Sequence, residues 1–236
     1  MNLEERGFLD AMAFWDDGRG IVLGDPVDGR FQILLTEDGG RRWTPLDPAG
    51  MPAALPHESA FAASGTCVCV AGDGRAWFGI GGGGQARVFS TVDGGRNWRA
   101  STTPIDASNE SSGIFSISFD GEGRVGLAVG GDYKLAERAV RSIAKTSDGG
   151  RTWSAEGLSS PLGYRSAVTR LSKDTWLVVG PSGSDLTVDG GASWRSVDRT
   201  SFDSVSVAGS TVWVSGERGG VARRRIREII EKHRHD

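Results

Sequence analysis

Short apolar stretches recur along the chain, and each of them is closed by a glycine. Five copies are present: GIVLG (20–24), WFGIG (77–81), GLAVG (126–130), WLVVG (176–180) and VWVSG (212–216). A short apolar run that stops at a turn residue is typical of a buried strand. The pattern therefore predicts five buried strands, spread along the chain.

A second pattern precedes each of these strands, a stretch in which apolar and polar residues alternate. Its copies are residues 8–14, 59–65, 113–119, 164–171 and 202–208. Alternation has the period of a strand that buries one face. We interpret these stretches as the innermost strands of five repeated units.

An octamer of the form Thr-x-Asp-Gly-Gly-x-x-Trp completes four of the five units. It occupies residues 36–43, 91–98, 146–153 and 187–194, at intervals of 55, 55 and 41 residues. Asp-Gly is a strong hairpin signal, because glycine accepts the positive φ that tight turns require. We expect the Thr and Asp side chains to brace the turn and the Trp to pack against the neighbouring unit. The residues with these structural roles are Thr36, Asp38, Gly40, Trp43, Thr91, Asp93, Gly95, Trp98, Thr146, Asp148, Gly150, Trp153, Thr187, Asp189, Gly191 and Trp194.

Each unit then consists of an inner strand, a second strand, a third strand, the octamer turn and an outer strand. Four short antiparallel strands in about 40–50 residues are typical of a propeller blade. The sequence therefore predicts an all-β fold, a β-propeller of about five four-stranded antiparallel blades, over residues 1–222. Residues 223–236 are expected to form a basic tail with a short helix, because Ile226, Ile229 and Ile230 share one helical face.

The octamers carry a family resemblance. They resemble Asp-boxes, also called BNR repeats, which occur in bacterial sialidases and in many other β-propellers. Only Thr152 matches the Thr that this motif has at its seventh position. Over residues 8–222 the chain is similar to bacterial Asp-box proteins grouped with the photosystem II stability/assembly factor. The resemblance implies a propeller with an assembly-factor-like role, an extracytoplasmic location, and further blades ahead of the point where this sequence begins.

The fifth unit has no octamer, so the count of strands indicates an incomplete ring, a fragment of a larger propeller, or a ring that closes by an unusual route. After VWVSG the chain runs into RRRIREIIEKHRHD, where a fifth hairpin is due. A propeller that does not close leaves an open blade edge, and such an edge promotes pairing with another chain. We therefore expect self-association through an open edge.

Composition and charge limit the classes of partner that the chain is expected to bind. The net charge is −3, and residues 223–236 carry six Lys and Arg against three acids, so the tail is basic and the body acidic. An acidic body without a basic face argues against nucleic acid as the main partner. No run of 18 apolar residues predicts a membrane span, and no apolar segment after Met1 predicts a secretion signal. Two Cys without a CxxC and three dispersed His predict neither a metal site nor a cofactor.

Propeller topology confines a binding site to the loops at the start of the inner strands, opposite the octamers. We expect a protein, a small molecule or a glycan to bind on this rim of the propeller. The residues expected to bind it are Asp25, Asp28, Glu58, Asp132, Tyr133, Arg165, Ser182 and Asp185. In this interpretation the protein is a non-catalytic scaffold.

The alternative function is a carbohydrate-active hydrolase on the same face. Glycosidases need two carboxyl groups that flank the scissile bond, and Glu58 and Asp132 are the candidate pair. A sialidase-like centre is a less good match, because sialidases hold their substrate with three arginines and only Arg165 stands at the start of an inner strand. If the protein is an enzyme, it is expected to be a glycoside hydrolase.

Overall fold

The computed structural model describes residues 7–72, 74–138, 140–161 and 163–232, and it contains five antiparallel sheets. The first two sheets are β1 (Leu9–Phe14), β2 (Gly20–Val27), β3 (Arg30–Thr36) and β4 (Thr44–Pro45), followed by β5 (Val68–Ala71), β6 (Arg75–Gly79), β7 (Arg87–Thr91) and β8 (Arg99–Thr102). The third and fourth are β9 (Ser112–Phe119), β10 (Gly126–Asp132) and β11 (Ile143–Thr146), then β12 (Ala167–Arg170), β13 (Trp176–Gly180), β14 (Gly183–Thr187) and β15 (Arg195–Asp198). The fifth is β16 (Ser204–Ala208), β17 (Thr211–Ser215) and β18 (Val221–Arg225), and it leads into the helix α1 (Ile226–Lys232). Short 3-10 turns lie at Pro48–Gly50, Tyr133–Leu135 and Glu217–Gly219.

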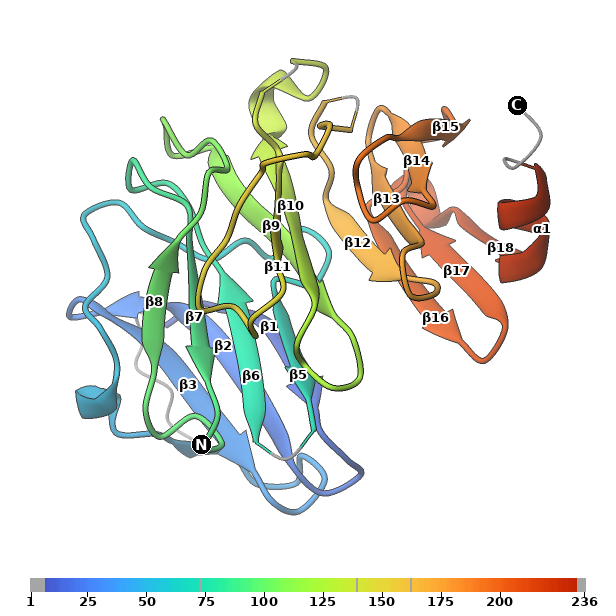
Figure 1. Ribbon diagram of the computed structural model, residues 1–236. Helices are drawn as coiled ribbons and strands as arrows, with labels where there is room; N and C mark the ends of the chain where they lie inside the picture. Colours follow the sequence, from blue (N-terminus) through green and yellow to red (C-terminus); the bar gives the residue numbers. More distant parts are fainter. Residues whose placement is uncertain (1–6, 73, 139, 162, 233–236) are drawn as a thin grey trace.

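The sheets follow one another as propeller blades. Within each sheet the strands pair in chain order, and the inner strand of each sheet contacts the inner strand of the next. The sheets fan out in sequence order, so that the sheet of β1 and the sheet of β16 lie at opposite ends of the series (Figure 1). The all-β fold, its five antiparallel sheets and its short C-terminal helix are confirmed.

The buried strands agree with the apolar pattern, whereas one inner strand does not. All five apolar runs overlap strands, namely β2, β6, β10, β13 and β17. The first four are buried as predicted, whereas β17 at the end of the series is only partly buried. The prediction of an inner strand at residues 59–65 is wrong, because that segment forms turns after an isolated bridge between Ser59 and Gly81. The inner strand is β5, in which Val68 pairs with Phe78. A continuous apolar run, VCVA, buries better here than the weakly alternating SAFAASG.

The four octamers form near-identical hairpin turns. In each, the Thr hydroxyl donates to the Asp carboxylate over 2.7–2.9 Å, and the second glycine N–H donates to the same hydroxyl. Both glycines have positive φ, for example 72° at Gly39 and 84° at Gly40. Burial alone would raise the pKa of Asp148, but hydrogen bonds, first of all from the Thr152 hydroxyl, lower that pKa to about 2.

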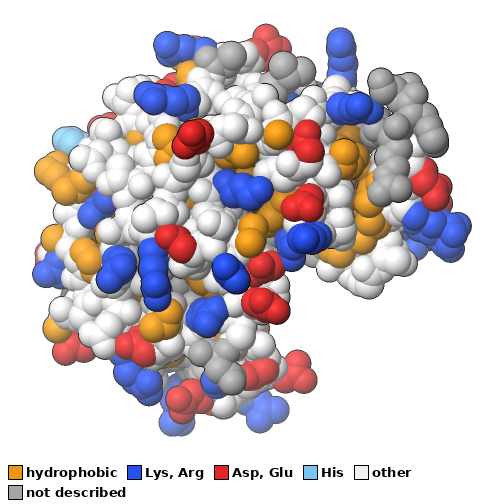
Figure 2. All heavy atoms as spheres, viewed as in Figure 1, with side chains coloured by type: hydrophobic (Ala, Val, Ile, Leu, Met, Phe, Trp, Pro, Cys, Tyr) orange, Lys and Arg blue, Asp and Glu red, His pale blue; other side chains and the backbone are white. Residues whose placement is uncertain are grey.

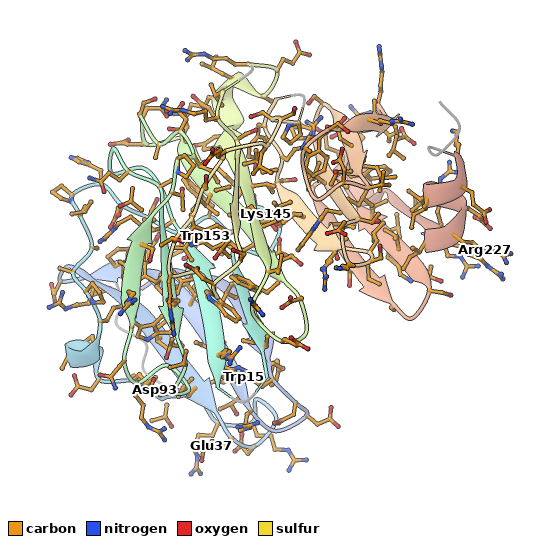
Figure 3. All side chains as sticks on the ribbon, in the orientation of Figure 1. Trp15, Glu37, Asp93, Lys145, Trp153 and Arg227 are labelled. Carbon is orange, nitrogen blue, oxygen red and sulfur yellow. The ribbon has the colours of Figure 1, made fainter. Side chains whose placement is uncertain are left out.

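Each octamer is also bonded to the turn between the first two strands of its own sheet. Gly39 donates to the Gly18 carbonyl oxygen, and Gly94, Gly149 and Gly190 make the equivalent bonds. The octamers therefore lie at the end of the sheets opposite the start of the inner strands. Figure 3 shows Trp15, Glu37 and Asp93 together at this end of the first two sheets.

Three of the four octamer tryptophans pack between sheets, and the helix takes this place in the fifth unit; Trp43 instead lies on the outward face of the first sheet. Trp98 belongs to the core between the first two sheets, and Trp153 to the core between the second and third. Trp194 packs against the core between the third and fourth sheets. Ile229 fills the corresponding core between the fourth and fifth sheets and is 4% exposed. The helix begins at Ile226, since residues 223–225 belong to β18, and residues 1–6 and 233–236 of the two predicted segments lie outside the described residues.

In the part of the chain that the structure describes, no helix has the length and apolar character needed to cross a membrane. The same part contains no group of three or more His, Cys, Asp or Glu side chains that could hold a metal ion.

Candidate functional site

The face at the start of the inner strands carries the predicted site residues, and the structure distributes them over separate clusters. The first cluster is centred on Glu58, which is 5% exposed. One of its carboxylate oxygens accepts from Arg87 Nε over 2.6 Å, and the other accepts from the Leu55 N–H. Both oxygens therefore hold the loop before β5 against β7.

Asp132 is the centre of a second cluster, at the end of β10. Its carboxylate accepts from the Ser111 hydroxyl over 2.7 Å, from the Asn109 amide over 3.0 Å and from the Lys134 N–H over 2.9 Å. Burial would raise the pKa of Asp132, but the hydrogen bonds from Ser111 and Asn109 keep that pKa below its ordinary value. An ionised, fully engaged carboxylate suits loop fixation better than proton transfer.

The third cluster joins the segment immediately before β12 to β14. Arg165 donates to Asp185 from two guanidinium nitrogens, over 2.9 and 2.5 Å, and it also donates to the Ser182 hydroxyl over 2.8 Å. Arg165 and Asp185 are each 1% exposed. This ion pair is a buried part of the blade.

Asp28 and Asp25 lie at the far end of β2 and have different roles. Asp28 and Gly29 form the two-residue hairpin between β2 and β3, with φ values of 51° and 76°. Positive φ at both positions is the requirement of this turn, and it gives Asp28 a structural role. Asp25 instead reaches the loop before β5, where its carboxylate accepts from the Ala60 N–H over 3.0 Å.

An aromatic cluster connects these groups across the face. Phe61 stacks on Phe115 with ring centroids 4.0 Å apart, and Phe115 meets Tyr164 edge-on at 4.7 Å. These three rings are almost fully buried, whereas Tyr133 beside them is 48% exposed. The pattern of the sequence did not reveal Phe61 and Phe115 as site residues, because both lie in stretches interpreted as ordinary strands.

Carboxyl groups with raised pKa flank the aromatic cluster on both sides. On the first sheet, burial and the nearby Asp25 raise the pKa of Asp10 to about 7, and burial raises the pKa of Asp25. On the fifth sheet, burial and then Glu217 raise the pKa of Asp203. Burial and Asp203 in turn raise the pKa of the Tyr164 hydroxyl. Asp10 and Asp203 stand at inner-strand starts but were absent from the predicted set.

Asp10 and Asp203 differ from Glu58, Asp132 and Asp185, whose carboxylates all accept hydrogen bonds from other side chains. Burial and neighbouring acids, rather than a cation, set the pKa of Asp10 and of Asp203. One carboxylate oxygen of Asp10 is buried without a hydrogen-bond partner among the described residues. On the face of the molecule shown in Figure 2, acidic and basic side chains are interspersed.

No protein-family model and no curated protein matches this chain. Solved structures do resemble it. YCF48 bound to D1 peptide has a TM-score of 0.58 at 20% identity, over 96% of this chain and 68% of that one. YCF48 from Cyanidioschyzon merolae has a TM-score of 0.53 at 20% identity, over 95% and 69%. The computationally designed Ika8 protein has a TM-score of 0.51 at 14% identity, over 92% and 58%. Together with the five sheets described above, the likeness to YCF48 shows that this chain has a β-propeller fold.

Proposed function

We propose that the protein is a non-catalytic propeller scaffold that binds a polypeptide segment on the face opposite the octamers, in the manner of an assembly factor. The observation that carries this proposal is the aromatic cluster flanked by Asp10, Asp25 and Asp203, whose raised pKa values reflect burial without a cation. A solved structure with a similar fold, YCF48, is bound to a peptide.

The carboxyl groups and the exposed aromatic ring of this face indicate which kind of peptide segment it would bind. A Lys or Arg side chain near Asp10 or Asp203 would favour the ionised carboxylate, because an opposite charge within hydrogen-bond reach lowers the pKa. The exposed ring of Tyr133 offers an amphipathic surface for an apolar side chain. We therefore assign the face to a basic segment with apolar residues. Glu58, Asp132 and Asp185 support the loops, while Asp25 and Tyr133 contact the segment.

Peptide binding by fluorescence anisotropy tests this function. Labelled peptides that differ only in carrying Lys or Glu next to Leu are compared on the wild-type protein and on Tyr133→Ala. The Lys peptide is expected to bind more tightly, and Tyr133→Ala should weaken it roughly five-fold or more, because a contact of this kind contributes about 1 kcal/mol or more. Affinity should also rise from pH 6 to pH 8, because Asp10, whose pKa is about 7, ionises in this range.

Val92→Ala supplies the matched control, since Val92 is 75% exposed and lies in an octamer turn. It should leave the affinity unchanged. Equal affinity for the Lys and Glu peptides, or equal weakening by Tyr133→Ala and Val92→Ala, would contradict the proposal.

A hydrolase is the second candidate, and one observation favours it. Glu58 and Asp132 are committed to loop contacts, but Asp10 has a pKa of about 7 beside Asp25. A carboxylic acid that titrates near neutrality next to a second carboxyl suits general acid catalysis. This candidate expects the pure protein to cleave aryl glycosides and Asp10→Asn to abolish the cleavage. Cleavage that Asp10→Asn retains would exclude this pair, and absence of cleavage by the wild type would remove the candidate.

A further inference from the structure

The outward face of the first sheet is apolar. Met12 and Phe14 of β1 are 61% and 39% exposed, although both are large hydrophobic side chains. With Trp43, with Asp10 and with the buried side chains of Val22 and Leu34, they line a groove of about 450 Å³. Trp43 meets Phe14 edge-on, with ring centroids 5.8 Å apart. An exposed apolar surface of this kind marks an interaction site.

The strand register identifies which residues of the other sheets are equivalent to those on this face. Gly20, Ala76, Gly126 and Trp176 each pair with the Thr of their octamer, so they are equivalent positions. Two residues further along, Val22 corresponds to Phe78, Ala128 and Val178. Those three residues lie in the cores shared with the preceding sheet.

Trp43 leads to the same conclusion. Its equivalents Trp98, Trp153 and Trp194 pack into the cores between their own sheet and the preceding one. The outward face of the first sheet therefore has the composition of a sheet–sheet interface. Among the described residues, no other sheet packs against it.

The outward face at the other end of the series is different. On the fifth sheet, Trp213 pairs with Ser206 on one side and with Arg223 on the other. The Arg223 guanidinium lies 5.4 Å from the centre of the Trp213 ring, and Arg225 is exposed on the same strand. The internal sheet–sheet interfaces are apolar on both sides, so this polar and basic face does not match the groove of the first sheet.

We propose that two copies of this chain associate through the outward faces of their first sheets. The same face of a second copy supplies an apolar sheet surface that matches the groove, and a self-complementary face produces a closed two-fold dimer. Met12 and Phe14 of each copy would pack against the groove beside Trp43 of the other. This inference does not rest on the proposed peptide-binding function, although the two sites adjoin at Asp10, which also lines the groove.

Sedimentation velocity over a concentration series of the full chain tests the proposal. The wild type is expected to shift from monomer to dimer with rising concentration. Met12→Glu should raise the dissociation constant at least a hundred-fold, because it places a charge in an apolar interface. Trp213→Glu on the fifth sheet is the matched control and should leave the constant unchanged.

Far-ultraviolet circular dichroism shows whether each variant is folded. If Met12→Glu does not fold, Met12→Ser replaces it, and this variant is also expected to weaken the dimer. A wild type that stays monomeric at every concentration would overturn the proposal. So would a dimer that Trp213→Glu dissociates and Met12→Glu leaves intact, since that result indicates head-to-tail association.

Discussion

Replacing Arg165 with methionine is expected to lower the free energy of unfolding by about 3–5 kcal/mol, because it leaves a buried charge without its partner. Arg165 and Asp185 are each 1% exposed, and the guanidinium donates twice to the same carboxylate oxygen. Methionine can fill much of the space but cannot satisfy Asp185. Urea unfolding followed by tryptophan fluorescence measures the change.

Two further variants show whether the loss comes from the unpaired charge. Arg19→Met removes a surface ion pair with Asp16, in which both side chains are 46% exposed, and should cost much less stability than Arg165→Met. The double variant Arg165→Met with Asp185→Leu should recover most of the stability that Arg165→Met loses. A small effect of Arg165→Met, similar to that of Arg19→Met, would contradict the role assigned to this pair.

Replacing Asp10 with asparagine is expected to stabilise the protein at pH 8 by up to about 4 kcal/mol and to have little effect at pH 4. The pKa of Asp10 is raised from 3.8 to about 7 in the folded protein, first by burial and then by Asp25. Between these two values the folded state holds more protons than the unfolded state. The wild type therefore loses stability as the pH rises from about 4 to about 7.

Thermal or urea unfolding at several pH values measures this dependence. Asp148→Asn is an informative control, because hydrogen bonds lower the pKa of Asp148 to about 2. The contribution of Asp148 is present above pH 4 and is lost as the pH falls through 2, so Asp148→Asn should destabilise at pH 8. If Asp10→Asn and wild type show parallel pH profiles, Asp10 does not titrate near neutrality.

The repeated elements could be predicted from the sequence because one local requirement recurs in each of them. All five apolar runs became strands, since a run such as WLVVG is buried from both sides between two sheets. The stretch 59–65 was misassigned because SAFAASG and VCVA are neighbours, and which of them pairs with β6 depends on packing against the adjacent sheet. Periodicity in a single segment does not contain that information.

The candidate site was less predictable, for a physical reason. The topology correctly indicates which loops share an end of the sheets, but it does not determine which polar groups satisfy one another. Glu58 pairs with Arg87, which is 29 residues away in the sequence, and Arg165 pairs with Asp185, which is 20 residues away. The pKa of Asp10 depends on burial and on Asp25, so it follows from the three-dimensional arrangement alone.

Hydrogen–deuterium exchange of the protein with and without the Lys-containing peptide tests the central claim most directly, because it reports which face the peptide covers. We expect slower exchange in residues 130–136 and 202–217, next to the aromatic cluster, and unchanged exchange in the four octamer turns. Slower exchange confined to the octamer turns would contradict this claim.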